Sequence, residues 1–353
     1  MPSATPIALA WHPLTDRPLV ERPPRQPAGS DRGRYRVLHV LPHLGRGGGQ
    51  YHMLRHISSM EVGHFEHVVC YLAARHDLRT TFEDAGLSPI FLDHRPGWGM
   101  GRTVVRLALL IRRERIDLVH ANTRGDRLAA ELAALLTSTP VVTTMRSPMS
   151  ARFYRGYPSL RRQRTRRRQA LERWLHRHTV RSVIAISESI RSQWLDTCRS
   201  LGFSHDVSLV YPGIDSAAFE SEVGEGTAHE ALGTQLGLAP GQPVLLNVAH
   251  LELRKGQRWL LAMMPEVLRH VPDAVLLIAG EGPERTTLET EITRRGLGAS
   301  VRLLGKRDDV PQLLGRADVF VFSSYELPGV AEAFGVAVLE ALAAGKPVVA
   351  FDL

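Results

Sequence analysis

The chain has 353 residues, of which 44% are hydrophobic and 23% charged, and its formal net charge is +8. This composition is globular and excludes a disordered or fibrous protein, while the length predicts about two domains. No run approaches the ~18 apolar residues of a membrane-spanning helix, and the first 34 residues lack the apolar core of a signal peptide. Two cysteines, Cys70 and Cys198, make no disulfide framework, so we expect a cytoplasmic protein.

Residues 1–34 are rich in proline and arginine and predict a disordered arm. From Arg36 onward, short apolar runs alternate with helical patterns such as Thr103–Arg113 and Asp126–Leu136, where Asp126 is a candidate helix cap. The expected strands of this first half are Val37–Leu41, His67–Leu72, Pro89–Leu92, Asp117–His120, Val141–Thr144 and Val183–Ile186. Continuous apolar runs of this kind are typical of a parallel sheet covered on both faces.

The basic charge is concentrated between Arg152 and Arg181, which hold eleven arginines and a single acidic residue, Glu172. One explanation is docking on an anionic membrane surface, with Trp174 and its aromatic neighbours in the headgroup region. The other is that Leu171, Trp174 and Leu175 pack on the core while the arginines form a solvated face. No motif favours binding to nucleic acid.

A polar stretch interrupts the alternation, and a second array of strands and helices follows it. The strands expected there are Val244–Val248, Val275–Ala279, Val301–Leu304, Val319–Phe322 and Val348–Phe351. We therefore predict an α/β protein of two facing, doubly wound, Rossmann-like domains. Residues 35–216 would form the first domain, 217–240 a linker and 241–353 the second domain.

The most informative segment runs from Glu332 to Pro347, between two expected strands. Gly335 would open a helix, and the free N–H groups of a helix start can bind phosphate. Glu332 lies just before that helix, within reach of a sugar hydroxyl. Glu340, nearer the middle, could accept hydrogen bonds from both ribose hydroxyls. Read alone, the two glutamates are also compatible with solvated surface acids.

This segment resembles the two-glutamate signature of retaining glycosyltransferases with the GT-B fold, of the large group 1 or family 4 type. The resemblance extends from about Arg36 to the last residue. Further matching segments are Leu253–Gly256, Gly280–Pro283, Val183–Ser187, Tyr211–Asp215 and Gly47–Gly49. Arg254 and Lys255 at a strand end are also compatible with ordinary surface charge. The glycines are also compatible with ordinary turns between strands and helices.

The resemblance implies transfer of a sugar from a nucleoside diphosphate to a hydroxyl of a glycan or lipid-linked acceptor, with the anomeric configuration kept. It implies that Arg254 and Lys255 bind the donor diphosphate, helped by the helix start at Gly335. Gly256, Gly280 and Phe334 belong to the same donor-binding site in this resemblance. In the same resemblance Glu340 binds ribose, Glu332 positions the donor sugar, and the loop of Gly48 and Gly49 lets the backbone approach donor and acceptor. No metal or other cofactor is implied.

Three departures from the family pattern stand out. Arg146 follows an expected strand where relatives carry a histidine close to the transferred sugar, and Ala249-His250 replaces a common Gly-Arg pair. A guanidinium cannot act as a base near neutral pH, but it can hold a phosphate. The chain stops where relatives continue, so we expect an incomplete second domain of poor solubility. The alternatives are a GT-B sugar-nucleotide epimerase and a non-catalytic nucleotide-sugar-binding protein.

Overall fold

The computed structural model describes residues 34–45, 48–60, 64–94, 99–122, 124–146, 174–200, 206–325, 327 and 332–351. These residues form two parallel sheets, each covered by helices on both faces, so the predicted α/β class is confirmed. Apart from Arg34, the predicted N-terminal arm lies outside the described residues. Most of the basic segment, residues 152–173, lies outside them too.

The first domain has a sheet of order β3-β2-β1-β4-β5-β6-β7. Its strands are β1 (Tyr35–Leu41), β2 (Phe65–Tyr71), β3 (Ile90–Phe91), β4 (Leu118–Ala121), β5 (Val141–Met145), β6 (Val180–Ala185) and β7 (Asp206–Leu209). Its helices include α1 (Gly48–Ser59), α2 (Arg79–Asp84), α3 (Gly99–Arg113), α4 (Arg124–Thr137) and α8 (Glu188–Ser200). One apolar cluster lies under α3, α4 and α8, and another under α1 and α2.

The second domain has a sheet of order β10-β9-β8-β11-β12. Its strands are β8 (Val244–Val248), β9 (Val275–Ala279), β10 (Val301–Gly305), β11 (Val319–Phe322) and β12 (Val348–Ala350). Its helices are α9 (Ser216–Val223), α10 (Thr227–Gln235), the 3₁₀ turn η1 (Leu253–Lys255), α11 (Gln257–His270), α12 (Arg285–Arg294), α13 (Val310–Arg316) and α14 (Val336–Ala343). The strands match the predicted ones to within one residue, because each contains a run of apolar residues.

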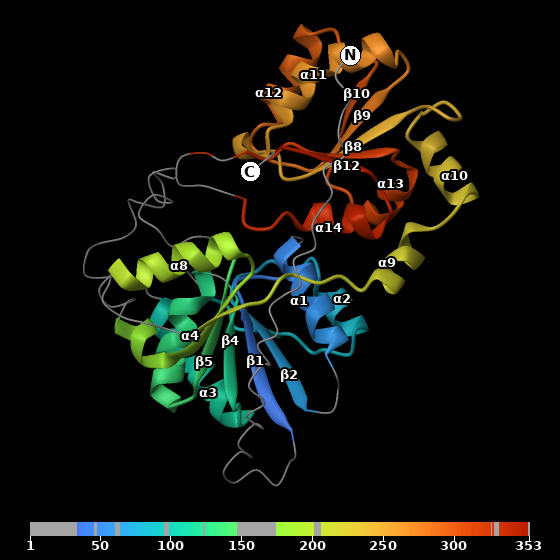
Figure 1. Ribbon diagram of the computed structural model, residues 1–353. Coiled ribbons are helices and arrows are strands. Elements are labelled where there is room, and N and C mark those ends of the chain that lie inside the picture. Colours follow the sequence, from blue (N-terminus) through green and yellow to red (C-terminus); the bar gives the residue numbers. More distant parts are fainter. Residues whose placement is uncertain are drawn as a thin grey trace, which may run out of the picture.

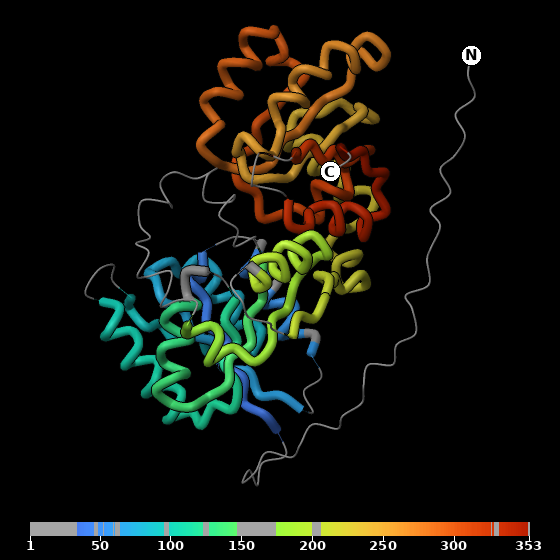
Figure 2. The backbone as a smooth tube through the Cα atoms, turned by 60° about the vertical axis from the view of Figure 1, so that its left-hand side comes forward, coloured from blue at the N-terminus to red at the C-terminus, as the bar shows by residue number. Residues whose placement is uncertain are grey.

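The two domains are stacked, as Figures 1 and 2 show, with α14 and α9 of the second domain next to α1 of the first. In each sheet the strand order reverses at the centre, between β1 and β4 and between β8 and β11. Ligands of doubly wound sheets bind beyond the carboxyl ends of the strands, at this reversal. The fold therefore predicts a ligand-binding site at the boundary between the domains.

Two local expectations differ from the structure. Residues 217–240, expected to be a linker, contain α9 and α10, whose Phe219 and Leu232 are buried in the second core. The apolar side chains of this segment are spaced at helical intervals, and Gly224 and Gly226 are helix caps instead of marking a flexible connection. Asp126 is not a cap, because α4 already begins at Arg124.

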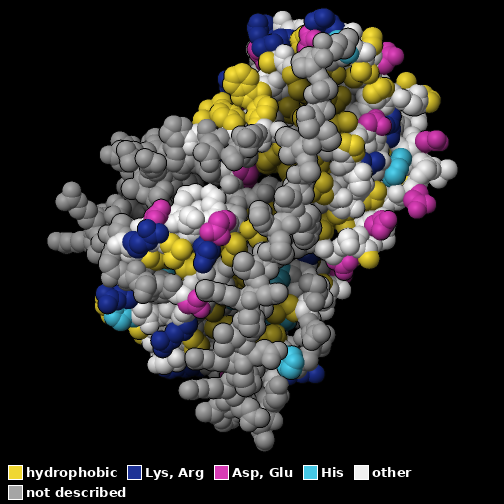
Figure 3. Space-filling view, viewed as in Figure 1, with side chains coloured by type: hydrophobic (Ala, Val, Ile, Leu, Met, Phe, Trp, Pro, Cys, Tyr) yellow, Lys and Arg dark blue, Asp and Glu magenta, His cyan; other side chains and the backbone are white. Residues whose placement is uncertain are grey.

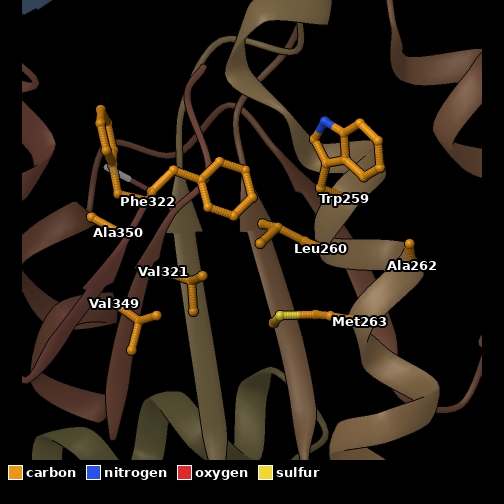
Figure 4. Close-up of a pocket in the computed structure, with 9 residues that line it drawn as sticks. Trp259, Leu260, Ala262, Met263, Val321, Phe322, Val349 and Ala350 are labelled. Carbon is orange, nitrogen blue, oxygen red and sulfur yellow. The ribbon is translucent and has the colours of Figure 1, made fainter. Parts of the chain in front are cut away.

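An apolar strip remains exposed on the second domain. Trp259 on α11, Val349 on β12 and Phe351 have 57%, 58% and 45% of their surface exposed. They line a groove of about 360 Å³ between α11 and the strands β11 and β12, shown in Figure 4. Figure 3 shows hydrophobic side chains gathered on this domain. No described residue covers this groove.

Both cysteines are buried in the first domain. Cys70 on β2 has no exposed surface, and Cys198 on α8 has 2%. Burial raises the pKa of the Cys198 thiol to about 11. Among the described residues, no helix is both long and apolar enough to cross a bilayer.

Candidate functional site

A compact acid–base cluster lies at the carboxyl edge of the second sheet. It consists of Arg254 and Lys255 in η1, Ser324 as the second residue after β11, and Glu332 ahead of α14. All three partners donate to the same oxygen, Oε2 of Glu332: Arg254 Nη1 at 3.2 Å, Ser324 Oγ at 3.0 Å, and Lys255 Nζ in a short hydrogen bond. The structure thus brings together three residues that the sequence predicts for the site, from segments 77 and 78 positions apart.

The charges of this cluster stabilise each other despite burial. Burial opposes ionisation of Glu332, but Lys255 and Arg254 outweigh it, so the pKa of Glu332 is lowered. Burial, together with the neighbouring Arg254, lowers the pKa of Lys255 even though Glu332 acts in the opposite direction. Lys255 is paired directly with the Glu332 carboxylate, which favours its charged form. The cluster is therefore a partly buried pair of cations held on one carboxylate, which is a suitable environment for an anionic ligand.

Glu340 lies on α14 and faces the first domain. Its Oε1 is 3.4 Å from Nη1 of Arg55, which comes from α1. Burial raises the pKa of Glu340, Arg55 partly offsets that effect, and Glu222 on α9 adds to it. The second predicted glutamate is therefore a half-buried carboxyl group at the domain boundary and not a solvated surface acid.

The loop before α14 links the two domains. Gly335 has φ +78° and is the N-cap residue of α14, as expected from the sequence. The neighbouring Phe334 has its ring centroid 6.1 Å from that of Tyr211, and it packs on the apolar cluster of the first domain. The N-terminus of α14, with its free N–H groups, therefore lies close to the domain boundary.

Gly256 and Gly280 are required by packing of the backbone. A Cβ at Gly256 would collide with the carbonyl oxygen of Ser323, and one at Gly280 with that of Ala249. Both glycines also have positive φ, of 67° and 150°. These contacts explain the two glycines without a ligand, so their place in donor binding stays a prediction.

On the first domain, Gly48 and Gly49 lie in the first turn of α1 and not in a loop. A Cβ at Gly49 would meet no described atom within 4 Å. Gly47 lies outside the described residues. The glycines therefore leave space beside the start of a helix instead of forming a separate glycine loop.

Arg146 directly follows β5, as predicted. It is half-buried, and its charge lowers the pKa of His120 on β4 and of His56 on α1. The structure thus places Arg146 in the first domain beside histidines, whereas Glu332 belongs to the acid–base cluster of the second. The catalytic role of Arg146 stays a prediction.

A row of histidines crosses the first sheet beneath α1. His39 Nδ1 lies 3.1 Å from His120 Nδ1, and His39 Nε2 lies 3.0 Å from His67 Nδ1. His120 Nε2 continues the row to Thr144 Oγ1 at 2.8 Å. Burial is the main reason that the pKa values of all three histidines are lowered, to about 3 for His120. The row is therefore uncharged at neutral pH.

Two residues of the site were missed from sequence. Ser324 could have been found, because polar residues directly after a buried strand lie at the ligand-binding edge. Arg55 could not, since nothing near it in sequence marks it and its partner Glu340 is 285 residues away.

In the basic segment, Trp174 is 49% exposed and Leu175 is buried. Of these two neighbours, Leu175 therefore packs on the core and Trp174 does not.

Two family models match the chain in succession. The model "Glycosyltransferase Family 4" matches residues 46–218, and "Glycosyl transferases group 1" matches residues 229–353. The chain belongs to the group 1 glycosyltransferases. The acid–base cluster and Glu340 lie within the second matched range.

Curated relatives of this group 1 glycosyltransferase include the α-D-kanosaminyltransferase of Streptomyces kanamyceticus, which is 26% identical over 72% of this chain and 65% of the relative. The UDP-Gal:α-D-GlcNAc-diphosphoundecaprenol α-1,3-galactosyltransferase of Escherichia coli is 25% identical over 71% of this chain and 62% of the relative. The chain thus spans less than two thirds of the length of these relatives.

Solved structures share the GT-B fold of this group 1 glycosyltransferase. Anabaena HepE in complex with UDP-glucose superimposes with a TM-score of 0.72 at 21% identity, over 89% of this chain and 80% of that one. WaaG, a glycosyltransferase involved in lipopolysaccharide biosynthesis, gives a TM-score of 0.62 at 17% identity, over 89% and 80% of the two chains. The predicted architecture of two facing domains is thereby confirmed.

Proposed function

We propose that this protein transfers a sugar from a nucleoside-diphosphate sugar to a hydroxyl of a glycan or lipid-linked acceptor, with retention of anomeric configuration. The observation that carries the proposal is the acid–base cluster at the N-terminal end of α14, with Glu340 on the same helix. Arg254 and Lys255 would neutralise the leaving diphosphate, helped by the helix N-terminus. Glu340 would accept hydrogen bonds from ribose.

The diphosphate would bind Arg254 and Lys255 in place of Glu332. Glu332 would then contact the donor sugar. In this reaction the bond between the anomeric carbon and the diphosphate oxygen breaks, and the acceptor oxygen bonds to that carbon on the same face. The proton of the acceptor hydroxyl passes to the leaving phosphate, so no protein base is required. Arg146 would then act as a charge near the phosphate or acceptor and not as a base. We propose that no metal takes part.

The nature of donor and acceptor is supported by relatives. HepE was solved with UDP-glucose, and the name of the Escherichia coli relative contains a UDP-sugar and a lipid-linked diphosphate acceptor. A donor with a nucleoside diphosphate fits the two cations, whose combined charge matches a diphosphate.

The test is a calorimetric titration with UDP, GDP and ADP. We expect selective binding of one nucleotide, and Glu340→Ala should weaken it by about 10- to 100-fold, because hydrogen bonds to a charged group contribute about 1.5–3 kcal/mol. Glu266→Ala, which removes an exposed carboxylate on α11, is the control and should bind as the parent does. Equal affinity of a folded Glu340→Ala variant would reject the assigned site.

Incubation with the donor sugar separates the proposed transfer from epimerisation. Retention predicts that an α-linked donor gives an α-linked product on an added acceptor, which NMR of the anomeric proton would show. Conversion of the nucleotide sugar without any acceptor would instead identify an epimerase. Binding without either reaction would indicate a non-catalytic protein.

We further propose that the segment from Arg152 to Arg181 attaches the protein to an anionic membrane surface at the cytoplasmic face. The exposed indole of Trp174, stacked on His178 at 4.6 Å, is the described part of this segment that supports it. Replacing Arg161, Arg162, Arg166 and Arg168 by glutamine should reduce co-sedimentation with anionic liposomes. Replacing Arg269, Arg285, Arg294 and Arg295 removes the same charge from the second domain and should leave it unchanged.

A further inference from the structure

Arg55 is the residue through which α1 of the first domain reaches the acids of the second. Its Nη1 lies 3.4 Å from Oε1 of Glu340, and its Nη2 lies 3.8 Å from Oε2 of Glu222. Its guanidinium carbon is also 5.4 Å from the ring centroid of Phe219 on α9. Three contacts from two helices of the other domain hold the guanidinium in one place.

The acid that Arg55 contacts is poorly placed to carry a charge by itself. Burial of Glu340 on α14 raises its pKa, and the negative charge of Glu222 raises it further. Among the residues that the structure describes, the cation that lowers it is Arg55. A ribose hydroxyl donates a stronger hydrogen bond to a carboxylate than to a protonated carboxyl group, because the acceptor is then charged.

We propose that Arg55 is a positioning residue for nucleotide binding: it keeps Glu340 ionised and correctly oriented for the ribose hydroxyls. This inference rests on the proposed function, since it assigns a role within the same donor site. A carboxylate offers about four lone-pair positions. Arg55 uses one on Oε1, so ribose can bind Glu340 without displacing Arg55.

The position of Arg55 has a consequence for the domains. Because Arg55 and Glu340 belong to different domains, their contact exists only while the domains are close together. Separation would remove this cation from Glu340 and leave the neighbouring acid Glu222, which lies in the same domain. Nucleotide binding and domain closure would therefore favour each other, as linkage requires.

The decisive experiment compares a nucleotide with its 2′,3′-dideoxy counterpart. Arg55→Met keeps an unbranched side chain over Phe219 but removes the charge. For the nucleoside diphosphate that the parent binds, we expect about tenfold weaker binding by Arg55→Met, corresponding to one charge-assisted hydrogen bond. The dideoxy compound lacks the hydroxyls, so the variant and the parent should bind it equally.

A purely structural role for Arg55 gives a different result, because it would weaken both compounds to the same extent. That outcome would overturn the inference, as would equal binding of the normal nucleotide by parent and variant. Both outcomes leave the proposed function intact. If the folded parent binds none of the three nucleotides, the proposed function fails and this inference fails with it.

The pH profile provides a second readout. Nucleotide affinity of the parent should fall as the pH drops through the pKa of Glu340, because the acceptor becomes protonated. Without Arg55 that pKa is higher, so the loss should begin at a higher pH in Arg55→Met. Arg55→Lys should restore much of the parent profile.

Glu222→Gln is the matched control, because it should shift the pKa of Glu340 in the opposite direction to Arg55→Met. It removes the acid that disfavours ionised Glu340, so the loss of affinity should begin at a lower pH than in the parent. Identical pH profiles for the parent, Arg55→Met and Glu222→Gln would exclude a role of Arg55 through Glu340. Circular dichroism confirms folding, and Arg55→Gln, which also removes the charge, serves as the test should Arg55→Met not fold.

Discussion

Oxygen Oε2 of Glu332 has three donors, from Lys255, Arg254 and Ser324. This carboxylate therefore binds the two cations that the proposed diphosphate would use. Its hydrogen bonds hold both positive side chains in place, which would reduce the entropy cost of assembling the site. A bound diphosphate would have to share these cations with Glu332 or displace it.

The histidine row makes a pH prediction at the scale of single residues. His120 has a pKa of about 3 in the folded state, against about 6.5 when unfolded, so below pH 6.5 the unfolded chain binds a proton that the folded protein does not. Stability should therefore fall as the pH decreases. His120→Gln should reduce the loss between pH 7.5 and pH 5 by about 2 kcal/mol.

Urea denaturation followed by far-UV circular dichroism at a series of pH values measures this effect. The relevant quantity is the change of the unfolding free energy with pH, because the substitution also removes hydrogen bonds to His39 and Thr144 at every pH. His270→Gln is the control, since His270 is 70% exposed on α11. An unchanged pH dependence in His120→Gln would mean that this histidine is protonated in the folded protein.

At the scale of elements, glycines determine how closely the loops of the second domain pack. Gly280 follows β9 at φ +150°, directly against the carbonyl of Ala249 from the neighbouring loop after β8. Gly280→Ala should therefore destabilise the second domain by about 3 kcal/mol, through steric overlap and backbone strain. Thermal unfolding would measure it.

Gly298→Ala is the matched control in the same domain. A Cβ at Gly298 meets no described atom within 4 Å, so stability should change by less than about 0.5 kcal/mol. If Gly280→Ala is as stable as this control, the loops after β8 and β9 can separate without cost. The tight packing seen in the structure would then not be required for folding.

The success of sequence reasoning also varied between elements. Strands such as β8 and β9 were located to the residue, because each is an apolar run buried on both faces. β7 was not predicted, because this edge strand alternates between exposed and half-buried residues and has no apolar run. α9 and α10 were interpreted as a linker, because glycines and acids masked the helical spacing of Phe219, Val223 and Leu232.

For the site, local patterns were enough wherever a residue follows a strand or begins a helix. Arg254, Lys255 and Gly335 lie where the motifs predicted, and Glu332 meets the two cations. The pairing of Arg55 with Glu340 depends on how one domain packs on the other. A single sequence contains no local signal for such a contact.

At the scale of the whole molecule, the exposed apolar strip of Trp259, Val349 and Phe351 predicts self-association of the protein. Exposed, contiguous apolar side chains next to the edge strand β12 favour contacts between copies. Trp259→Arg combined with Val349→Lys should raise the solubility limit and reduce concentration-dependent light scattering. Trp174→Arg, which changes an exposed tryptophan of the first domain, should have little effect; equal improvement by both variants would indicate a general effect of charge.

The two buried thiols provide a built-in reporter for one half of the molecule. Cys70 and Cys198 are the only cysteines of the chain, and both lie in the core of the first domain. A thiol reagent such as a maleimide can reach them only when that domain opens, so the labelling rate measures its unfolding alone. Loss of the helix and strand signals in circular dichroism, without labelling of Cys70 or Cys198, would then report unfolding of the second domain. The opening of the second domain could thus be followed separately, with no engineered probe.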